Sequence, residues 1–232
     1  MEGARIFFTL PFFDGIPITE TVVVTWGIMA VLTILAIITG RNLEKIPRGI
    51  QNVMELYVET INNFTRDNMG ESKKGFSAYM GTIMLYLLFA NLAGLVGLRP
   101  PTADINATFA LAIMTFFIIQ GGGLIKKGPK TYLKGYLEPM PFLLPLNIIS
   151  EISLPISLAF RLFGNVVAGT IILTLLYGAL GSLSGMLGIT FAPVFQVGIP
   201  IFFHAYFDLF SGALQSFIFV MLSMVFISMA WD

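Results

Sequence analysis

The chain has no cysteine and a single histidine, and both scarcities exclude classes of site. Without cysteine there is no disulfide framework, no thiolate metal ligand and no cysteine nucleophile. One histidine also rules out a metal site built from several histidines of this chain, although an ion site lined by carboxylates remains open. The chemistry of the protein therefore depends on its other polar residues.

Charge is scarce as well. Only 11% of the 232 residues are charged and 56% are hydrophobic, whereas about a quarter of the residues in soluble domains are charged. The 13 basic and 13 acidic residues cancel, so no net field favours nucleic acid as a partner. This composition excludes a soluble domain and predicts an integral membrane protein.

The spacing of the charges predicts how often the chain crosses the membrane. A bilayer core of about 30 Å needs about 20 apolar residues, and a single segment can cross lipid only as a helix with its backbone bonds satisfied. The charge-free runs are 21–40, 75–98, 105–125, 162–207 and 209–231. Residues 162–207 are too long for one crossing, and glycine, serine and proline residues from Gly178 to Pro193 predict a turn within them. We therefore expect an all-α integral membrane protein with five transmembrane helices.

The last two predicted helices are longer than the bilayer requires. Residues 141–180 and 190–231 would each form a helix of about 60 Å against about 30 Å of hydrocarbon. Either strong tilt of the helices or kinks at their prolines would absorb the excess length. The prolines of these segments are Pro155, Pro193 and Pro200. Within a single membrane domain of residues 1–232, we expect a tilted helical hairpin over about 141–231.

An amphipathic helix is predicted over about residues 47–69. Apolar side chains recur there at intervals of three and four, whereas Glu55, Glu59 and two asparagines occupy the other side. Pro47 suits the first turn of a helix. We expect this helix to lie along the cytoplasmic interface of the membrane. Packing on a partner subunit would produce the same pattern.

Lysine and arginine mark one side of the membrane. They gather between the first and second predicted crossings and between the third and fourth, whereas the opposite side has only Arg5 and Arg99. Because cytoplasmic loops accumulate positive residues, we expect the amino terminus outside and the carboxyl terminus in the cytoplasm. The segment before the first crossing is short, acidic and interrupted by Pro11, which is not typical of a cleaved signal peptide.

The glycine run near the end of the third crossing does not form a phosphate-binding loop. Gly123 and Gly128 have the glycine spacing of such a loop, but Pro129 stands where lysine is required and no serine or threonine follows it.

The strongest functional signal is a set of ionisable residues inside the last two predicted helices: Glu151, Arg161, His204 and Asp208. A charge at the centre of a bilayer costs about 2.5–3.5 kcal/mol on insertion scales, so such a residue is a functional candidate. Arg161 lies deep within its helix, and a guanidinium remains protonated there. It is therefore a fixed cation. A structural ion pair with Glu151 or Asp208 is the alternative interpretation.

Other polar residues follow these charges at helical intervals. Ser157, Arg161 and Asn165 recur every four residues beside small residues, which predicts the close approach of a neighbouring helix. His204, Asp208, Ser211 and Gln215 form one polar line that resembles the wall of an ion path. Thr170 faces away from Arg161, and hydrogen bonding to a carbonyl of its own helix is the alternative for Thr170 and Ser211.

Residues 158–169, LAFRLFGNVVAG, resemble the signature of subunit a of F-type ATP synthases, the stator part of a proton or sodium channel. The resemblance continues at Asn91, Pro101–Asp104, Pro145–Asn147 with Glu151, and Leu214–Phe219. The compact size and the short outer loop resemble bacterial members.

The resemblance implies a role for each polar residue. In that family an invariant arginine faces a rotating c-ring, whose carboxylates take up an ion from one aqueous half-channel and release it to the other. By position, Arg161 prevents a short circuit, Glu151 belongs to the inner half-channel, and Asn165 and Gln215 line the arginine's surroundings. The implied partners are the c-ring, subunit b of the peripheral stalk, the rest of the complex, the lipid, and protons or sodium ions. ATP chemistry would occur elsewhere, in a complex of the bacterial cell membrane, and no cofactor or metal is implied.

The outer half-channel departs from the family's pattern. The family pairs a glutamate and a histidine, at positions nine residues after the arginine and seven before the glutamine, where this chain has Thr170 and Asp208. His204 lies one turn from Asp208, so the two can hydrogen-bond, and we expect them to replace the usual pair. A carboxylate with hydroxyls would suit sodium as well as a proton relay.

Two other functions compete with this interpretation. A stand-alone secondary transporter or ion channel would use Arg161 to bind an anion, but it predicts inverted repeats or broken helices that the sequence does not show. A membrane anchor for other subunits explains the helices and leaves the internal charges unexplained. Neither accounts for the signature segment.

Overall fold

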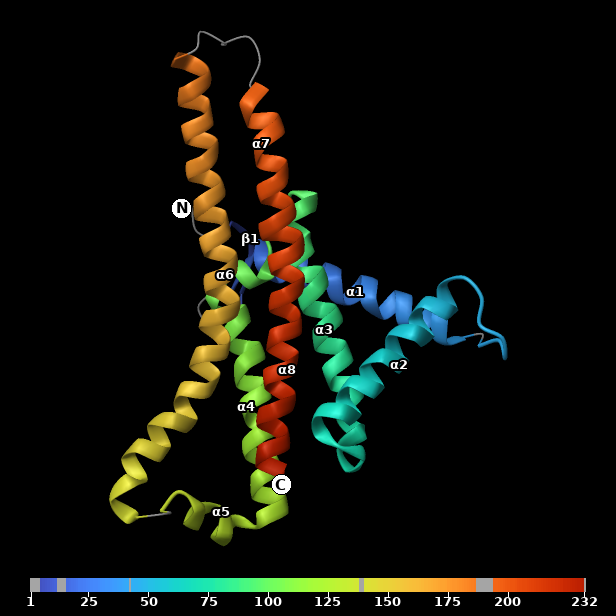
Figure 1. Ribbon diagram of the computed structural model, residues 1–232, viewed down its shortest axis with the longest axis vertical. Helices are drawn as coiled ribbons and strands as arrows, with labels where there is room; N and C mark the ends of the chain where they lie inside the picture. Colours follow the sequence, from blue (N-terminus) through green and yellow to red (C-terminus); the bar gives the residue numbers. More distant parts are fainter. Residues whose placement is uncertain (1–4, 12–15, 42, 138–139, 187–193, 232) are drawn as a thin grey trace.

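The structure is a computed structural model that describes residues 5–11, 16–41, 43–137, 140–186 and 194–231 (Figure 1). Five helical stretches within these ranges are long and apolar enough to cross a membrane. They contain α1 (Glu20–Arg41), α3 (Ser77–Leu92), α4 (Ile105–Lys127), α6 (Leu144–Met186), and α7 (Val194–His204) continued by α8 (Gly212–Trp231). The prediction of an all-α protein with five membrane-spanning helices is confirmed.

The core lies where α3, α4, α6 and α8 meet. Fully buried side chains come from each of the four helices, among them Met80, Ala112, Leu162 and Phe219. By contrast α1 is apolar on all sides and almost entirely exposed, with a contact of 3.3 Å between the hydroxyls of Thr25 and Tyr86. A helix that is apolar all round is suited to a lipid environment.

Two long helices dominate the shape of the molecule. In Figure 1, α6 changes direction in its first third and then runs beside α7, and both extend beyond the other helices. Pro155 is the twelfth residue of α6, and it has no N–H to donate to the carbonyl of Glu151 four residues earlier. In the same view α1 runs across the direction of α6 and α8. These helices therefore do not all stand upright in one bilayer, and the tilt of the last two remains a prediction.

Helix α6 ends at Met186 and α7 begins at Val194, within the range in which the sequence predicted a turn, and residues 187–193 lie outside the described part of the chain. The helix continues through Gly178 and Gly185 to Met186, and Pro193 lies outside the described residues. A Cβ at Gly181 would lie 2.7 Å from the Gln196 amide nitrogen, which itself donates to the Tyr177 carbonyl at 3.0 Å. Small residues here permit close helix packing rather than ending the helix.

Helix α2 (Ile50–Met69) is the predicted amphipathic helix, but it begins after Gly49 rather than at Pro47. Ile61 is buried against the bundle, while Ile50 and Val53 remain exposed. The Tyr57 hydroxyl donates to the Gly81 carbonyl at 2.7 Å, and burial raises the pKa of Tyr57 to about 12. Its position at the membrane interface remains a prediction.

Three further elements are absent from the sequence-based expectation. Strands β1 (Ile6–Leu10) and β2 (Ile16–Thr19) pair antiparallel ahead of α1. The short helix α5 (Pro129–Gly135) follows α4. A π-helical segment, Ala205–Ser211, joins α7 to α8 and contains Asp208.

Candidate functional site

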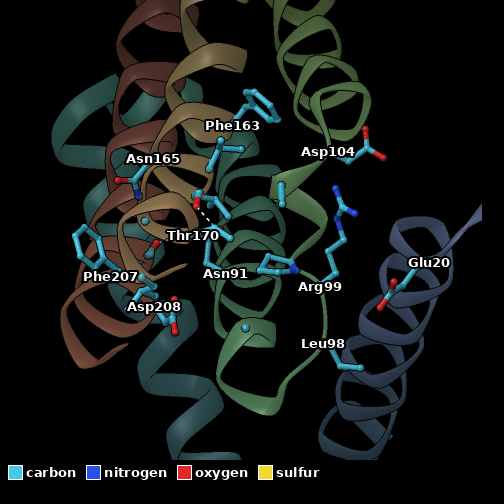
Figure 2. Close-up of a pocket in the computed structure, with 18 of the residues that line it drawn as sticks. Glu20, Asn91, Leu98, Arg99, Asp104, Phe163, Asn165, Thr170, Phe207 and Asp208 are labelled. Atoms are coloured by element: carbon cyan, nitrogen blue, oxygen red, sulfur yellow. Dashed lines mark hydrogen bonds between the residues drawn. The ribbon is translucent and has the colours of Figure 1, made fainter. Parts of the chain in front are cut away.

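A cavity of about 1240 Å³ lies among the N-terminal hairpin, the α3–α4 connection, α6 and the π-helical segment; we call it the larger cavity. Figure 2 shows Glu20, Arg99 and Asp104 on one side of it and Asn165, Thr170 and Asp208 on the other. It thus combines a charged rim with polar side chains from the two long helices.

The expected contact between His204 and Asp208 forms on the wall of this cavity. The His204 Nδ1 atom lies 2.6 Å from Asp208 Oδ2, and its Nε2 atom lies 3.2 Å from the Tyr177 hydroxyl. A carboxylate that is ionised only accepts, so Nδ1 donates to it in that state, and an imidazole that is neutral then accepts from the Tyr177 hydroxyl at Nε2. The three side chains form a continuous hydrogen-bonded chain. Tyr177 was missed by sequence reasoning because its partner is 27 residues away on another helix.

Of the remaining predicted residues, Asn165 and Thr170 line this cavity, whereas Ser211 does not line it. The Ser211 hydroxyl donates to Asn165 Oδ1 at 2.9 Å and so links α6 to the π-helical segment. The Thr170 hydroxyl instead donates to the Val166 carbonyl of its own helix at 2.9 Å, as its alternative interpretation held. Thr170 still lines the cavity, and its methyl group and hydroxyl oxygen contribute to that wall.

Asn91 fixes the floor of the larger cavity. Its amide nitrogen donates to the Gly212 carbonyl at 2.9 Å and to the Ser216 hydroxyl at 3.1 Å, and its oxygen accepts from Thr102 at 2.7 Å. A Cβ at Gly212 would lie 2.9 Å from the Cβ of Asn91. The glycine therefore permits the close approach that holds α8, and with it the π-helical segment, against α3.

Glu151 lies in a second, smaller cavity of about 340 Å³ between α4, α5 and the start of α6. Its Oε2 atom accepts a hydrogen bond of 2.8 Å from the Gln120 amide. The smaller cavity is also lined by Lys127, Tyr132, Tyr136, Asn147 and Ser150. The structure thus separates Glu151 from Asp208, because each belongs to a different cavity.

Arg161 lines neither cavity. Its side chain is exposed on α6, about 15 Å along the helix from Glu151 and about 14 Å from Thr170. The ion pairs among the described residues are Arg66 with Asp67, Arg66 with Glu71, and His204 with Asp208. The alternative in which Arg161 pairs with Glu151 or Asp208 is therefore wrong for this structure.

Gln215 is the last of the predicted residues. It is buried on α8, and its amide nitrogen has no hydrogen-bond partner among the described residues. A buried amide without a partner carries a free-energy cost, so this group is available to a partner outside the chain or to water. The structure does not bring Gln215 into either cavity.

Comparison with known proteins gives a consistent result. A family model described as ATP synthase A chain matches residues 22–228. The chain is 36% identical over 229 residues to "ATP synthase subunit a, sodium ion specific" of Propionigenium modestum. The matched residues cover 92% of this chain and 74% of that protein. It is 32% identical to ATP synthase subunit a of Moorella thermoacetica, over 92% of this chain and 91% of that one. It is 34% identical to ATP synthase subunit a 2 of a Bradyrhizobium strain, over 99% and 97% of the two chains. The matched range includes Glu151, Arg161 and Asp208.

Proposed function

The chain belongs to the ATP synthase subunit a family, and from that premise we propose that its two cavities are the half-channels through which ions reach and leave the c-ring. As a member it is the stator ion-channel subunit of an ATP synthase and a multi-pass membrane protein. One observation carries the proposal: each cavity contains one of the two half-buried carboxylates that the long helices carry, Glu151 in the smaller and Asp208 in the larger, and Arg161 of α6 lines neither cavity.

The larger cavity is the outer half-channel. The N-terminal hairpin and Arg99 border it, on the side where basic residues are few. The smaller cavity is the inner half-channel, because Lys127 of the basic α4–α5 segment lines it and positive residues accumulate in the cytoplasm. With this assignment we expect the amino terminus outside and the carboxyl terminus in the cytoplasm, within a single membrane domain.

Asp208, with His204 and Thr170, receives the ion in the larger cavity, and Glu151 passes it on in the smaller one. Arg161 keeps the two paths apart. It is exposed in the free chain and has no hydrogen bond or ion pair with any described residue, which is costly for a charge within lipid. A ring carboxylate facing it supplies the missing countercharge. That carboxylate stays ionised beside the guanidinium and passes only after it has released its ion.

Asn165 lies one turn beyond Arg161 on α6, and we assign it and Gln215 to the surroundings of the arginine. The coupling ion is a proton or a sodium ion. The sodium-specific name of the P. modestum relative supports including sodium, and sodium dependence of ATP hydrolysis by the intact complex distinguishes the two. Subunit b has a suitable contact surface on α1 and on the exposed apolar residues of α2, Ile50 and Val53.

Substitution of Arg161 tests this function. We expect Arg161→Ala to abolish ATP synthesis driven by an ion gradient while the subunit still inserts, because the barrier between the half-channels is lost. Arg161→Lys should rescue poorly, since an ammonium lacks the planar fork of a guanidinium. Arg66→Ala is the matched control, because Arg66 is also exposed but lies on α2. Retained synthesis in membranes that carry Arg161→Ala would contradict the proposal.

A further inference from the structure

The Glu151 carboxylate is held by a network from α4 and α5 that the assignment of the half-channels does not use. Gln120 donates from its amide nitrogen to Glu151 at 2.8 Å. On the other side, the Gln120 oxygen accepts from the Tyr132 hydroxyl and, at 3.1 Å, from the Tyr136 hydroxyl. The two tyrosine oxygens are 3.1 Å apart. Gln120 therefore contacts the carboxylate directly, and the two tyrosines contact Gln120 from the other side.

This network fixes which way the Gln120 amide points. A carboxylate only accepts hydrogen bonds, so it must face the NH₂ group, while the carbonyl oxygen turns to the two hydroxyl donors. Burial, the hydrogen bond with Tyr136 and the charge of Glu151 raise the pKa of Tyr132. Tyr132 therefore keeps the proton that it donates. A flipped amide would place its oxygen against the carboxylate and lose the hydrogen bond to Glu151.

Contacts with α4 and α6 fix the positions of Tyr132 and Tyr136. A Cβ at Gly123 of α4 would overlap the ring of Tyr132, so the ring rests against α4 because position 123 is glycine. Asn147 at the start of α6 donates to the Tyr136 carbonyl at 2.8 Å. The two rings meet edge to face, with centroids 5.4 Å apart. Helix α5 is thus attached to both α4 and α6 beside the smaller cavity.

We propose that Gln120, oriented by Tyr132 and Tyr136, is the positioning residue for Glu151 in ion passage through the smaller cavity. The proposal rests on the assignment of this cavity as the inner half-channel. Gln120 itself does not line the cavity, so it acts through the carboxylate: its N–H holds the Glu151 carboxylate in one place. The hydroxyls of Tyr132 and Tyr136 do not contact Glu151 but donate to the Gln120 oxygen, and so they hold the Gln120 amide in this orientation.

Gln120→Glu separates positioning from packing because it keeps the shape and replaces the N–H donor with a carboxylate. The assay is ATP-driven ion pumping by the intact complex in vesicles, normalised to assembled complex and expressed relative to wild type at each pH. We expect pumping to fall about tenfold at neutral pH and to recover on acidification, when one carboxyl takes up a proton and donates to the other. A ratio to wild type that does not change with pH would overturn the proposal.

The chain offers a closely matched control. Gln51 of α2 also donates to a glutamate, with 2.6 Å between its Nε2 atom and Glu55 Oε1, and the pair is exposed and lies outside both cavities. Gln51→Glu makes the same chemical change beside a glutamate. We expect it to pump as wild type at every pH.

Four further variants complete the test. Glu151→Gln examines the underlying assignment: wild-type pumping would refute the role of Glu151 itself, whereas reduced pumping together with a pH-independent ratio for Gln120→Glu would refute only the positioning role. Tyr132→Phe and Tyr136→Phe remove one hydroxyl each. We expect each single variant to have a small effect, since the other hydroxyl still holds the amide, and the double variant to lose more than the product of the two. If the loss of pumping in the double variant equals the product of the two single losses, the two hydroxyls do not share the role of orienting Gln120.

Discussion

Three consecutive glycines near the end of α4 offer a graded test of the packing on that side of the molecule. A Cβ at Gly121 would meet nothing within 4 Å, one at Gly122 would overlap the indole of Trp231, and one at Gly123 would overlap the ring of Tyr132. All three residues are helical. Alanine at each position therefore has the same effect on the α4 backbone and a different effect on its neighbours.

The expected sizes follow from two opposing terms. Replacing glycine by alanine inside a helix stabilises by about 0.8–1.0 kcal/mol. Forcing an extra methyl group into a packed contact costs about 1–3 kcal/mol. Gly121→Ala should thus raise the free energy of unfolding by up to about 1 kcal/mol. Gly122→Ala and Gly123→Ala should each have a free energy of unfolding about 1–3 kcal/mol below that of Gly121→Ala.

The three variants also differ in what they disturb. The chain has two tryptophans, so a Trp26→Phe background leaves Trp231 as its sole indole, and its emission should change in Gly122→Ala alone. ATP-driven pumping should fall mainly in Gly123→Ala, where Tyr132 is displaced. Thermal unfolding of the purified complex gives the order of stability. Equal stability of the three variants, or unchanged Trp231 emission in Gly122→Ala, would refute the reasoning.

Three other predictions concern distant parts of the chain. Asp208→Asn should reduce ion flux per assembled complex by about tenfold or more, and His204→Ala by less, because only the first removes the negative charge that attracts a cation; wild-type flux in Asp208→Asn would reject the inlet assignment. The raised pKa of Tyr57, about 12 when folded against about 10 when unfolded, contributes stability that is fully present below about pH 10 and is lost as the pH rises through about 12. Thermal unfolding of wild type over that pH range should show this loss, and Tyr57→Phe should show a shallower decline. At neutral pH the variant should be less stable than wild type, because the hydrogen bond to the Gly81 carbonyl is missing. In a structure of the intact complex in lipid, α6 and the helix formed by α7 and α8 should be strongly inclined, and upright helices that end at the membrane surfaces would contradict the length argument.

The sequence predicted the features that depend on composition along the chain. Long apolar runs between charges indicated the membrane-spanning helices, because lipid leaves a crossing segment no other way to satisfy its backbone. The i, i+4 spacing of His204 and Asp208 predicted a contact that the structure forms at 2.6 Å. Both predictions rest on local geometry that tertiary packing does not change.

Features that depend on packing between distant segments were not predicted. Gln120 and Glu151 are 31 residues apart, and nothing in either neighbourhood indicates the other. Gly178, Gly181 and Gly185 contributed to the predicted turn, yet they remain helical because neighbouring helices in a membrane bundle use small residues for close approach. The same reason explains Gly122 and Gly123 of α4. The hairpin of β1 and β2 lacked any pattern long enough to predict it.

The π-helical segment that contains Asp208 changes how positions on this helix should be compared between relatives. A π turn accommodates one residue more than the α turn it replaces, so it records a single-residue insertion absorbed within Ala205–Ser211. Suppose that a relative has a regular α-helix over this stretch. The difference between its residue numbers and those of this chain then changes by one from the residues before the π-helical segment to the residues after it. A fixed count back from Gln215 then reaches a different side of the helix in the two proteins. Equivalence at Asp208 should therefore be decided by superposition across the segment, and deleting one residue within it would return His204 and Gln215 to the phase of an unbroken α-helix.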